Sequence, residues 1–309
     1  MKLLYHPIML EHLVDDSCPE KPERVGYVVD NIPEIYQGLE RLAQGSGDSL
    51  MLHAPNGEKY LSLVHTQEYI KKIKNISEQA GEGIKGDEDN FISAQTYKAA
   101  CYAVGGAVHA AKLARQGQKS LVLCRPPGHH ARAGKESGFC FFNNAAIAAE
   151  YLLQKEERVL IVDTDLHLGD GTLEYVTGKE EVFYFSINGE GLWPHLEPDE
   201  LPNAEHIFLP AGTDDQRYLA VLQDRLVPTI HQFDPSIIVV SAGFDTFHLD
   251  YQNYREALGG GFMLTEKSYK AIWKILDEVL VPYCAVLEGG YDPESVVAGV
   301  RSFLDKDKD

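Results

Sequence analysis

Short apolar runs rich in β-branched residues alternate along this chain with segments of helical spacing. The runs are SLVLC (120–124), RVLIVD (158–163), EVFYFSI (181–187), SIIVVSAG (236–243) and PYCAVLEGG (282–290). Helical spacing occupies residues 93–116, 144–157 and 265–280. Strands that are apolar throughout and separated by helices are typical of a parallel sheet covered on both faces. The pattern therefore predicts an α/β fold.

Size and charge limit the possible partners. A chain of 309 residues can bury a large core in one domain or two, and 44% hydrophobic with 24% charged residues is ordinary for a globular protein. We see no long linker, repeat or low-complexity tract, so we expect one domain over residues 1–309. The net charge of −19 disfavours direct binding to nucleic acid or anionic membranes and would attract a cationic substrate, although it could equally serve solubility alone.

The sequence also bears on the cellular compartment. No apolar run approaches the ~20 residues of a membrane span. The N-terminal stretch MKLLYHPIMLEHLVDD is a poor signal peptide and fits a first strand better. Five scattered cysteines without a CxxC motif indicate free thiols. We therefore expect a cytoplasmic protein, with a surface loop at residues 81–90 and a frayed tail at 304–309.

Polar motifs follow four of the expected strands. They are RPPGHHA (125–131), DTDLHLGDGT (163–172), SAGFD (241–245) and LEGGYD (287–292). Ligands of open α/β sheets bind beyond the carboxyl ends of the strands. These motifs are therefore the candidate site.

Asp165, His167 and Asp245 have the chemistry of a metal site. Asp163, Asp165 and His167 alternate along an extended segment and so share a face. Such a group is costly unless a cation holds it, although a solvated strand end with chance acids is the plainer alternative. With Asp245, the pair Asp165 and His167 would make a three-ligand site with an open position, as catalytic metals have. Two carboxylates and one imidazole suit Zn²⁺, and also Fe²⁺.

Two further motifs carry possible catalytic groups. His129 and His130 stand in tandem after a strand, and Asp163 or Asp170 could orient each imidazole. Tyr291 follows two glycines that could turn its phenol into a cleft. Singly, each of these has an ordinary structural alternative, as does the aromatic turn GFCFFNN (138–144).

Together, these motifs resemble the histone deacetylase family, which includes acetylpolyamine amidohydrolases and acetoin-utilization proteins. RPPGHHA, GFCFFNN, DTDLHLGDGT, SAGFD and LEGGY occur in the family's order, after VHTQEYI (64–70), and the match runs from about residue 12 to 300. The resemblance implies the arginase–deacetylase fold, a single α/β domain around a mainly parallel eight-stranded sheet with helices on both faces. It also implies zinc-dependent removal of acyl groups from amines.

The resemblance assigns roles residue by residue. It makes Asp165, His167 and Asp245 the metal ligands. His130 matches the general base and acid, His129 its electrostatic partner, and Tyr291 the phenol that donates to the substrate carbonyl. The carboxylates that orient the two imidazoles match Asp163 and Asp170.

Substrate contacts and a second ion follow in the same way. Phe139 matches one wall of an acyl-lysine tunnel and Gly138 a backbone acceptor there, and Trp193 is expected on the opposite wall. Asp89 is the best match for a rim acid, with Asp87 as a near competitor. A structural potassium ion is implied at Asp163, Asp165, His167, Ser186 and Ile187.

The chain also departs from the family pattern. Leu168 stands where many members have a second His, and Phe247–His248 replaces a common Ala-His pair. In FSINGEGLWP (185–194), Asn188 replaces the His of the commoner Ser-x-His. This different loop leaves substrate width and acyl-chain preference open.

The alternatives concern substrate and activity. We expect an ε-acyl-lysine in a peptide or protein, because the chain is short for the family and has no obvious long insertion that would narrow the mouth. An acetylated polyamine is the alternative. An arginase-like enzyme would need a second set of metal ligands, and an inactive acyl-lysine binding module should have lost a ligand, the His pair or Tyr291. The sequence shows no second set of metal ligands, and it keeps the three ligands, the His pair and Tyr291. The sequence does not indicate an oligomeric state.

Overall fold

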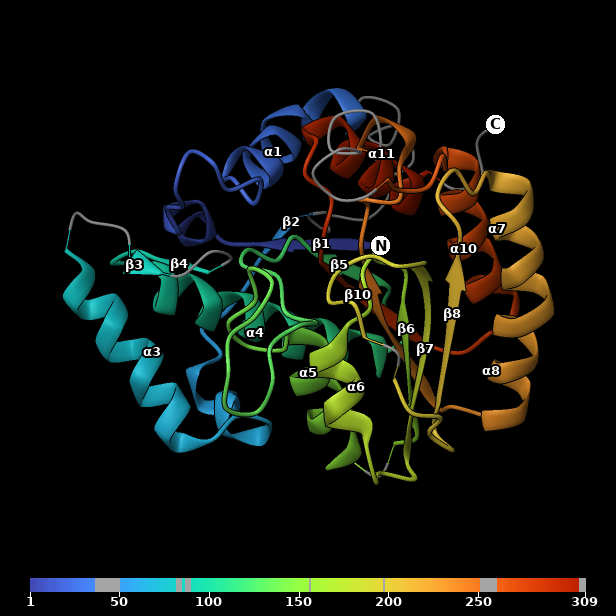
Figure 1. The fold of residues 1–309 in the computed structure, drawn as a ribbon, viewed down its shortest axis with the longest axis horizontal. Helices are drawn as coiled ribbons and strands as arrows, with labels where there is room; N and C mark the ends of the chain where they lie inside the picture. The colour runs from blue at the N-terminus through green and yellow to red at the C-terminus, as the bar shows by residue number, and fades with distance from the viewer. Residues whose placement is uncertain are drawn as a thin grey trace.

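A parallel sheet forms the centre of the computed structural model, which describes residues 1–36, 51–81, 85–86, 90–155, 157–196, 198–250 and 260–305. Eight strands pair in parallel throughout. Their order is β2 (Met51–His53), β1 (Lys2–Tyr5), β5 (Ser120–Val122), β10 (Tyr283–Leu287), β9 (Ile237–Ala242), β6 (Val159–Asp163), β7 (Val182–Gly189) and β8 (Ala204–Leu209). The strands twist markedly from β1 to β8 (Figure 1). The α/β class and the eight strands are as predicted.

Helices cover both faces of this sheet (Figure 1). One layer consists of α1 (Glu23–Tyr36), α11 (Pro293–Leu304), α10 (Glu266–Glu278), α7 (Asp215–Val221) and α8 (Val227–Phe233), with the π-helical turn η3 (Leu222–Leu226) between the last two. The opposite layer consists of α4 (Thr96–Ala114), α5 (Asn144–Leu153) and α6 (Asp170–Val176). Outside α4 lie α3 (Gln67–Ala80) and the 3₁₀ turn η2 (Glu58–Leu63), and the 3₁₀ turn η1 (Pro7–Glu11) follows β1.

The central strands are apolar because both of their faces are covered. Every residue of β6, β9 and β10 is buried, and their Val, Ile and Leu side chains belong to a core that reaches from β1 to the end of β8. A smaller apolar cluster joins α3, α4 and α5 around Tyr69, Phe141 and Phe142. The strand ends are therefore fixed on a rigid base.

The sequence missed the edge strands β2 and β8. β2 has three residues, and β8 (AEHIFL) mixes charged and apolar residues because it is half-exposed. The expected loop at 81–90 contains the short strand β3 (Lys85–Gly86), which pairs antiparallel with β4 (Phe91–Ile92). At the other end, α11 ends at Leu304 and Asp305 follows as its C-cap, while residues 306–309 lie outside the described part.

The cysteines and the helices bear on the remaining expectations. All five cysteines are buried and unpaired, which confirms the prediction of free thiols. Among the described residues, none of the helices combines the length and apolarity needed to cross a lipid bilayer.

A close backbone crossing fixes the start of η2 against α4. A Cβ atom on Gly105 would lie 1.8 Å from the carbonyl oxygen of Pro55, and the amide of Gly57 donates a hydrogen bond to Cys101 O at 2.8 Å. Position 105 therefore has no room for a side chain.

We predict that Gly105→Ala lowers the free energy of unfolding by about 2 kcal/mol or more, because backbone must move. The matched control is Gly26→Ala in α1, where a Cβ would lie an ordinary 3.8 Å from Leu10 Cδ1. The control should gain up to ~1 kcal/mol from helix propensity. Urea unfolding measures both, and equal effects would contradict the crossing.

Candidate active site

The four polar motifs meet at the carboxyl ends of the central strands. β5, β10, β9 and β6 are neighbours in that order, and because they are parallel their carboxyl ends lie together. Each strand delivers one motif: RPPGHHA follows β5, LEGGYD ends β10, SAGFD ends β9 and DTDLHLGDGT begins at the end of β6. The topology thus assembles residues that lie far apart in the sequence.

Asp165, His167 and Asp245 converge on one buried point. Ligand atoms of the three side chains lie within 4.8 Å of one another. His167 Nδ1 lies 3.2 Å from Asp165 Oδ1 and 3.0 Å from Asp245 Oδ2. Two carboxylate oxygens and one imidazole nitrogen form a three-ligand donor set that suits a catalytic divalent metal. These residues therefore fit the metal that the resemblance implies.

Backbone amides hold the two carboxylates in place. Asp165 Oδ2 accepts a hydrogen bond from the amide of Gly289 at 2.7 Å, and Asp245 Oδ1 accepts one from the amide of Leu166 at 2.9 Å. A Cβ on Gly243 would lie 2.4 Å from Asp165 Oδ2, so the backbone after β9 passes directly against this side chain. The cluster is therefore rigid.

The electrostatics of the cluster also favour a cation. Burial and the charge of Asp165 raise the pKa of Asp245 to about 6. Burial lowers the pKa of His167, but its hydrogen bonds to Asp165 and Asp245 outweigh this and raise that pKa to about 9. The three groups thus hold a proton among them, and a divalent metal would replace it.

Each histidine of the tandem pair is bonded to a carboxylate. His129 Nδ1 donates to Asp163 Oδ2 at 3.0 Å, and His130 Nδ1 donates to Asp170 Oδ1 at 2.8 Å. A carboxylate on Nδ1 leaves Nε2 as the basic nitrogen of a neutral imidazole. His129 Nε2 lies 3.8 Å from Asp165 Oδ2, so this nitrogen faces the three-residue cluster.

The two imidazoles differ in their electrostatic surroundings. Burial lowers the pKa of His129, but the charges of Asp165 and Asp163 outweigh it and raise the pKa well above the usual value. Burial and the adjacent His129 lower the pKa of His130 to about 4. His130 is therefore the imidazole kept neutral, which a general base requires.

Tyr291 closes the other side of the site. Its ring lies 5.0 Å from the guanidinium of Arg24, and its backbone amide donates to Asp250 Oδ1 at 3.0 Å. Burial and the charges of Asp165 and Asp245 raise the pKa of Tyr291 well above its usual value, so the phenol keeps its proton.

The predicted substrate-contact residues border these groups. The Trp193 ring contacts the His130 ring edge-on at 4.5 Å between centroids, and the Phe139 ring contacts the Tyr291 ring at 5.8 Å. A Cβ on Gly138, where φ is +50°, would lie 2.6 Å from both His130 and Trp193. Phe139 and Trp193 thus lie against the two proposed catalytic side chains, while Asp89 and Asp87 lie outside the described residues.

Several buried charged residues support the site and were not found from the sequence. Glu288 accepts hydrogen bonds from the amides of Gly128 (2.7 Å) and His129 (3.1 Å), and so fixes the histidine loop to the end of β10. Arg24 donates to the carbonyl oxygens of Glu288 and Gly290. The only sequence signal for Glu288 was its position as a lone carboxylate after a buried strand. No sequence signal marked Arg24.

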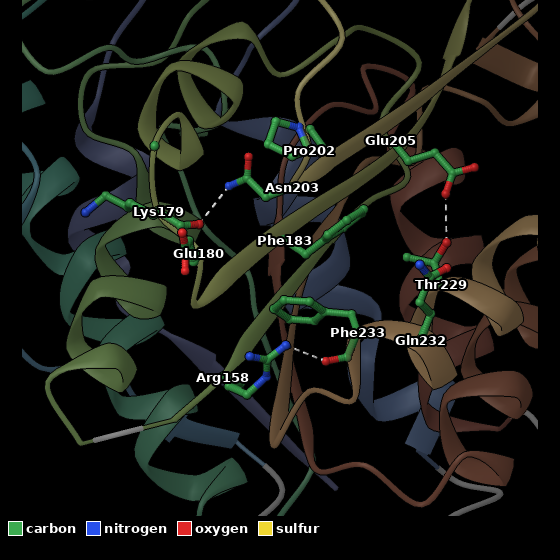
Figure 2. Close-up of a pocket in the computed structure, with 12 residues that line it drawn as sticks. Arg158, Lys179, Glu180, Phe183, Pro202, Asn203, Glu205, Thr229, Gln232 and Phe233 are labelled. Carbon is green, nitrogen blue, oxygen red and sulfur yellow. Dashed lines mark hydrogen bonds between the residues drawn. The ribbon is translucent and has the colours of Figure 1, made fainter.

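Two further features are a second buried group of possible metal ligands, which shares His129 and Glu288 with this site, and a pocket that lies apart from it. His129, Cys140 and Glu288 form a second buried group with metal-ligand atoms. A pocket of about 700 Å³ lies at the amino ends of β7 and β8, where Phe183, Phe233 and Arg158 line it (Figure 2). Of the predicted site residues that the structure describes, none lines this pocket, which lies at the opposite, amino-terminal ends of the strands.

A buried histidine outside the proposed catalytic set, His65, links the aromatic turn to the segment before α3. The backbone amide of Asn143 donates to His65 Nε2 at 2.9 Å, and His65 Nδ1 donates to Arg132 O at 3.0 Å. Both ring nitrogens are therefore used by a neutral imidazole. Burial lowers the pKa of His65 from 6.5 to about 4.

We predict an acid-dependent loss of stability at His65. Below the unfolded pKa of ~6.5 the unfolded chain binds a proton that the folded chain excludes, so stability falls as the pH drops from about 6.5 toward 4. Relative to His65→Gln, the free energy of unfolding should fall by about 2–3 kcal/mol between pH 7.5 and 4.5. A pH-independent difference between the two proteins in urea unfolding would refute this.

Comparisons with known proteins agree with this geometry. The family model described as "Histone deacetylase domain" matches residues 18–306. The chain is 30% identical to "Probable deacetylase" of Archaeoglobus fulgidus, over 96% of this chain and 82% of that one, and 33% identical to "Acetylpolyamine amidohydrolase" of Burkholderia pseudomallei, over 80% and 73%. The crystal structure of the HDA15 HD domain superposes with a TM-score of 0.83 at 27% identity, covering 98% of this chain and 90% of that one. The arginase–deacetylase fold is thereby confirmed, and the chain belongs to the histone deacetylase family.

Proposed function

We propose that residues 1–309 act as one zinc-dependent deacetylase domain that hydrolyses the amide bond of acylated amines. The observation that carries the proposal is the buried convergence of Asp165, His167 and Asp245 beside two carboxylate-bound histidines. Zn²⁺ suits this donor set, and Fe²⁺ is the alternative. When bound, such a metal polarises the substrate carbonyl and lowers the pKa of water toward ~7.

The residues of the chain would divide the proton transfers. His130, kept neutral and oriented by Asp170, accepts a proton from the attacking water and returns it to the departing amine. His129, whose pKa is raised, supplies positive charge beside it. The Asp170 carboxylate also accepts two hydrogen bonds from Arg132, at 3.1 and 2.7 Å. Burial raises the pKa of Asp170, but His130 and then Arg132 outweigh burial and lower that pKa.

Tyr291 would stabilise the oxyanion that forms when water adds to the carbonyl. Its raised pKa keeps the hydroxyl a donor, and the contact with Arg24 holds its ring. A donor aimed at the developing negative charge contributes mainly in the transition state.

The side chain of the acyl-lysine would pass between Phe139 and Trp193. These rings are half-buried and lie against Tyr291 and His130 respectively. An extended acyl-lysine side chain is apolar along its length, so aromatic walls suit it. Gly138 would contribute a backbone acceptor, and Asp89 a rim carboxylate.

We favour ε-acyl-lysine as the substrate class and acetylated polyamines as the second candidate. The net charge of −19 would attract an acetylated polyamine, which keeps charged amines, and equally a basic peptide that carries a neutral acyl-lysine. The similarity to an acetylpolyamine amidohydrolase keeps the second candidate open. The buried free cysteines fit a reducing compartment such as the cytoplasm.

The potassium ion implied by the resemblance is not part of this proposal. Its five expected positions, Asp163, Asp165, His167, Ser186 and Ile187, are buried around the end of β6 and the middle of β7. The side chain of Asn188, however, bonds to oxygens of this set. The residues present therefore do not fit the ion.

Removal of the metal tests the proposal as a whole. We predict that chelation with dipicolinate abolishes hydrolysis of an acetyl-lysine peptide and that one equivalent of Zn²⁺ restores it, because the residues of the site have no other electrophile. Asp245→Asn should weaken zinc binding, whereas Asp215→Asn, at the start of α7, should not. Full turnover in a preparation shown to be free of metal would refute the proposal.

The role of Tyr291 is tested by removing its hydroxyl. We predict that Tyr291→Phe lowers kcat by ~10²–10³ with little change in KM, because the hydrogen bond acts in the transition state. The control is Tyr283→Phe at the other end of β10, where the hydroxyl donates to Asp277. Normal kcat in Tyr291→Phe would mean that another group stabilises the oxyanion.

Substrate class is tested by kcat/KM, which measures discrimination directly. Acetyl-lysine peptides should be hydrolysed with a higher kcat/KM than acetylputrescine or acetylspermidine. A preference of about tenfold or more for an acetylpolyamine would overturn the substrate assignment and leave the deacetylase proposal standing.

A further inference from the structure

Asn188 bonds to the backbone of the loop that carries two of the proposed metal ligands. It lies near the end of β7 and is fully buried. Its amide nitrogen lies 3.0 Å from the carbonyl oxygen of His167 and 3.3 Å from that of Asp165. Its amide oxygen lies 2.7 Å from Ser186 Oγ.

The chemistry of these partners fixes the orientation of the amide. Carbonyl oxygens can only accept, so the atom that faces Asp165 O and His167 O is the NH₂ group, with one hydrogen for each. Ser186 Oγ then donates to Asn188 Oδ1. Within the described part of the chain, the buried side-chain atoms that lack a partner include none from Asn188 or Ser186. The polar needs of this small cluster are met by one neutral side chain.

These three oxygens belong to Asp165, His167 and Ser186, which are among the five residues that the resemblance expects around a potassium ion, partly through backbone carbonyls. A cation needs carbonyl and hydroxyl lone pairs turned toward it. Here the amide hydrogens of Asn188 point at two of these oxygens, and the positive end of the amide dipole would repel a cation beside them. The sequence departure from Ser-x-His to Ser-x-Asn thus coincides with a structural replacement.

We propose that the Asn188 amide takes the place of the monovalent cation in this chain, so that the loop carrying Asp165 and His167 is fixed without potassium. The replacement tethers the loop to β7 through a side chain of fixed position. It also avoids burying a further charge beside a divalent metal. The proposal rests on the metal ligands of the proposed function, but its predicted response is to potassium.

The consequence concerns metal affinity as well as stability. Groups that orient metal ligands change metal affinity by ~10–100-fold when they are removed. A site held by Asn188 should bind its metal equally well in the presence and absence of potassium. A site held by a potassium ion should instead bind its metal more weakly when potassium is absent.

The test compares cobalt binding and thermal unfolding in potassium chloride and in tetramethylammonium chloride at one ionic strength. Co²⁺ reports binding through its visible absorption and needs no turnover. For the unmodified protein, the cobalt affinity should differ by less than about twofold between the salts, and the Tm of the metal-free protein should not change. For Asn188→Ala, cobalt should bind ~10-fold or more weakly in tetramethylammonium, and potassium should restore both affinity and Tm.

Asn203→Ala is the matched control. Asn203 Nδ2 also donates to backbone carbonyls, those of Val176 (2.7 Å), Lys179 (2.8 Å) and Val182 (3.1 Å), away from the metal ligands. Its removal should lower Tm equally in both salts. Asn188→His serves where Asn188→Ala does not fold, and it too should respond to potassium.

The overturning result is a potassium response of the unmodified protein. If potassium raises its Tm or tightens its cobalt binding as much as it does for the Asn188 variants, the ion is bound and Asn188 does not replace it. The Tm of metal-free protein gives this answer even if cobalt does not bind, and such a lack of binding would instead count against the proposed metal centre.

Discussion

The packing of two carboxylates and an imidazole around one buried point is the constraint on which the rest of this structure depends. Asp165, His167 and Asp245 place ligand atoms within 4.8 Å of one another in the interior. Buried charges so close together are unfavourable unless they are compensated. The amides of Leu166 and Gly289 bond to the carboxylates and hold them in position. A divalent cation at this point would satisfy all three side chains together.

The surrounding shell consists of charged groups that bond to one another and to backbone. Asp163 accepts hydrogen bonds from His129 (3.0 Å) and the Tyr184 hydroxyl (2.9 Å). Elsewhere in this shell, the Glu20 carboxylate oxygen Oε1 lies 2.6 Å from Arg24 Nη1 and 3.1 Å from Arg125 Nε. This network ties the region before α1 to the ends of β5 and β10. The geometry of the site is therefore distributed over the whole sheet, and each histidine has a fixed orientation before any substrate binds.

Much of this arrangement could be predicted from local pattern. Apolar runs and helical spacing identified the central strands and main helices because full burial leaves a strong signal. The short or half-exposed strands β2 and β8 gave none, since their sequences are set by their position at the sheet edge. The ordered motifs led to the proposed metal ligands, the two histidines and Tyr291, and the structure brings these side chains together.

Other features depend on contacts that sequence spacing does not reveal. Arg24 lies 266 positions from Gly290, whose carbonyl it bonds, so no local pattern could pair them. Glu288 was visible as a carboxylate after a strand, but its hydrogen bonds to the histidine loop required the fold. Asn188 was visible as a departure from the family, and its consequence emerged from its bonds to Asp165 O and His167 O.

Anomalous X-ray diffraction at the zinc absorption edge, on crystals grown with Zn²⁺, tests the central claim most directly. The account predicts a strong peak between Asp165 Oδ1 or Oδ2, His167 Nδ1 and Asp245 Oδ2 that disappears below the edge. The structure offers a second buried group of metal-ligand atoms, His129, Cys140 and Glu288, as an internal alternative. A peak at that group, or no peak beside Asp165, His167 and Asp245, would contradict the account.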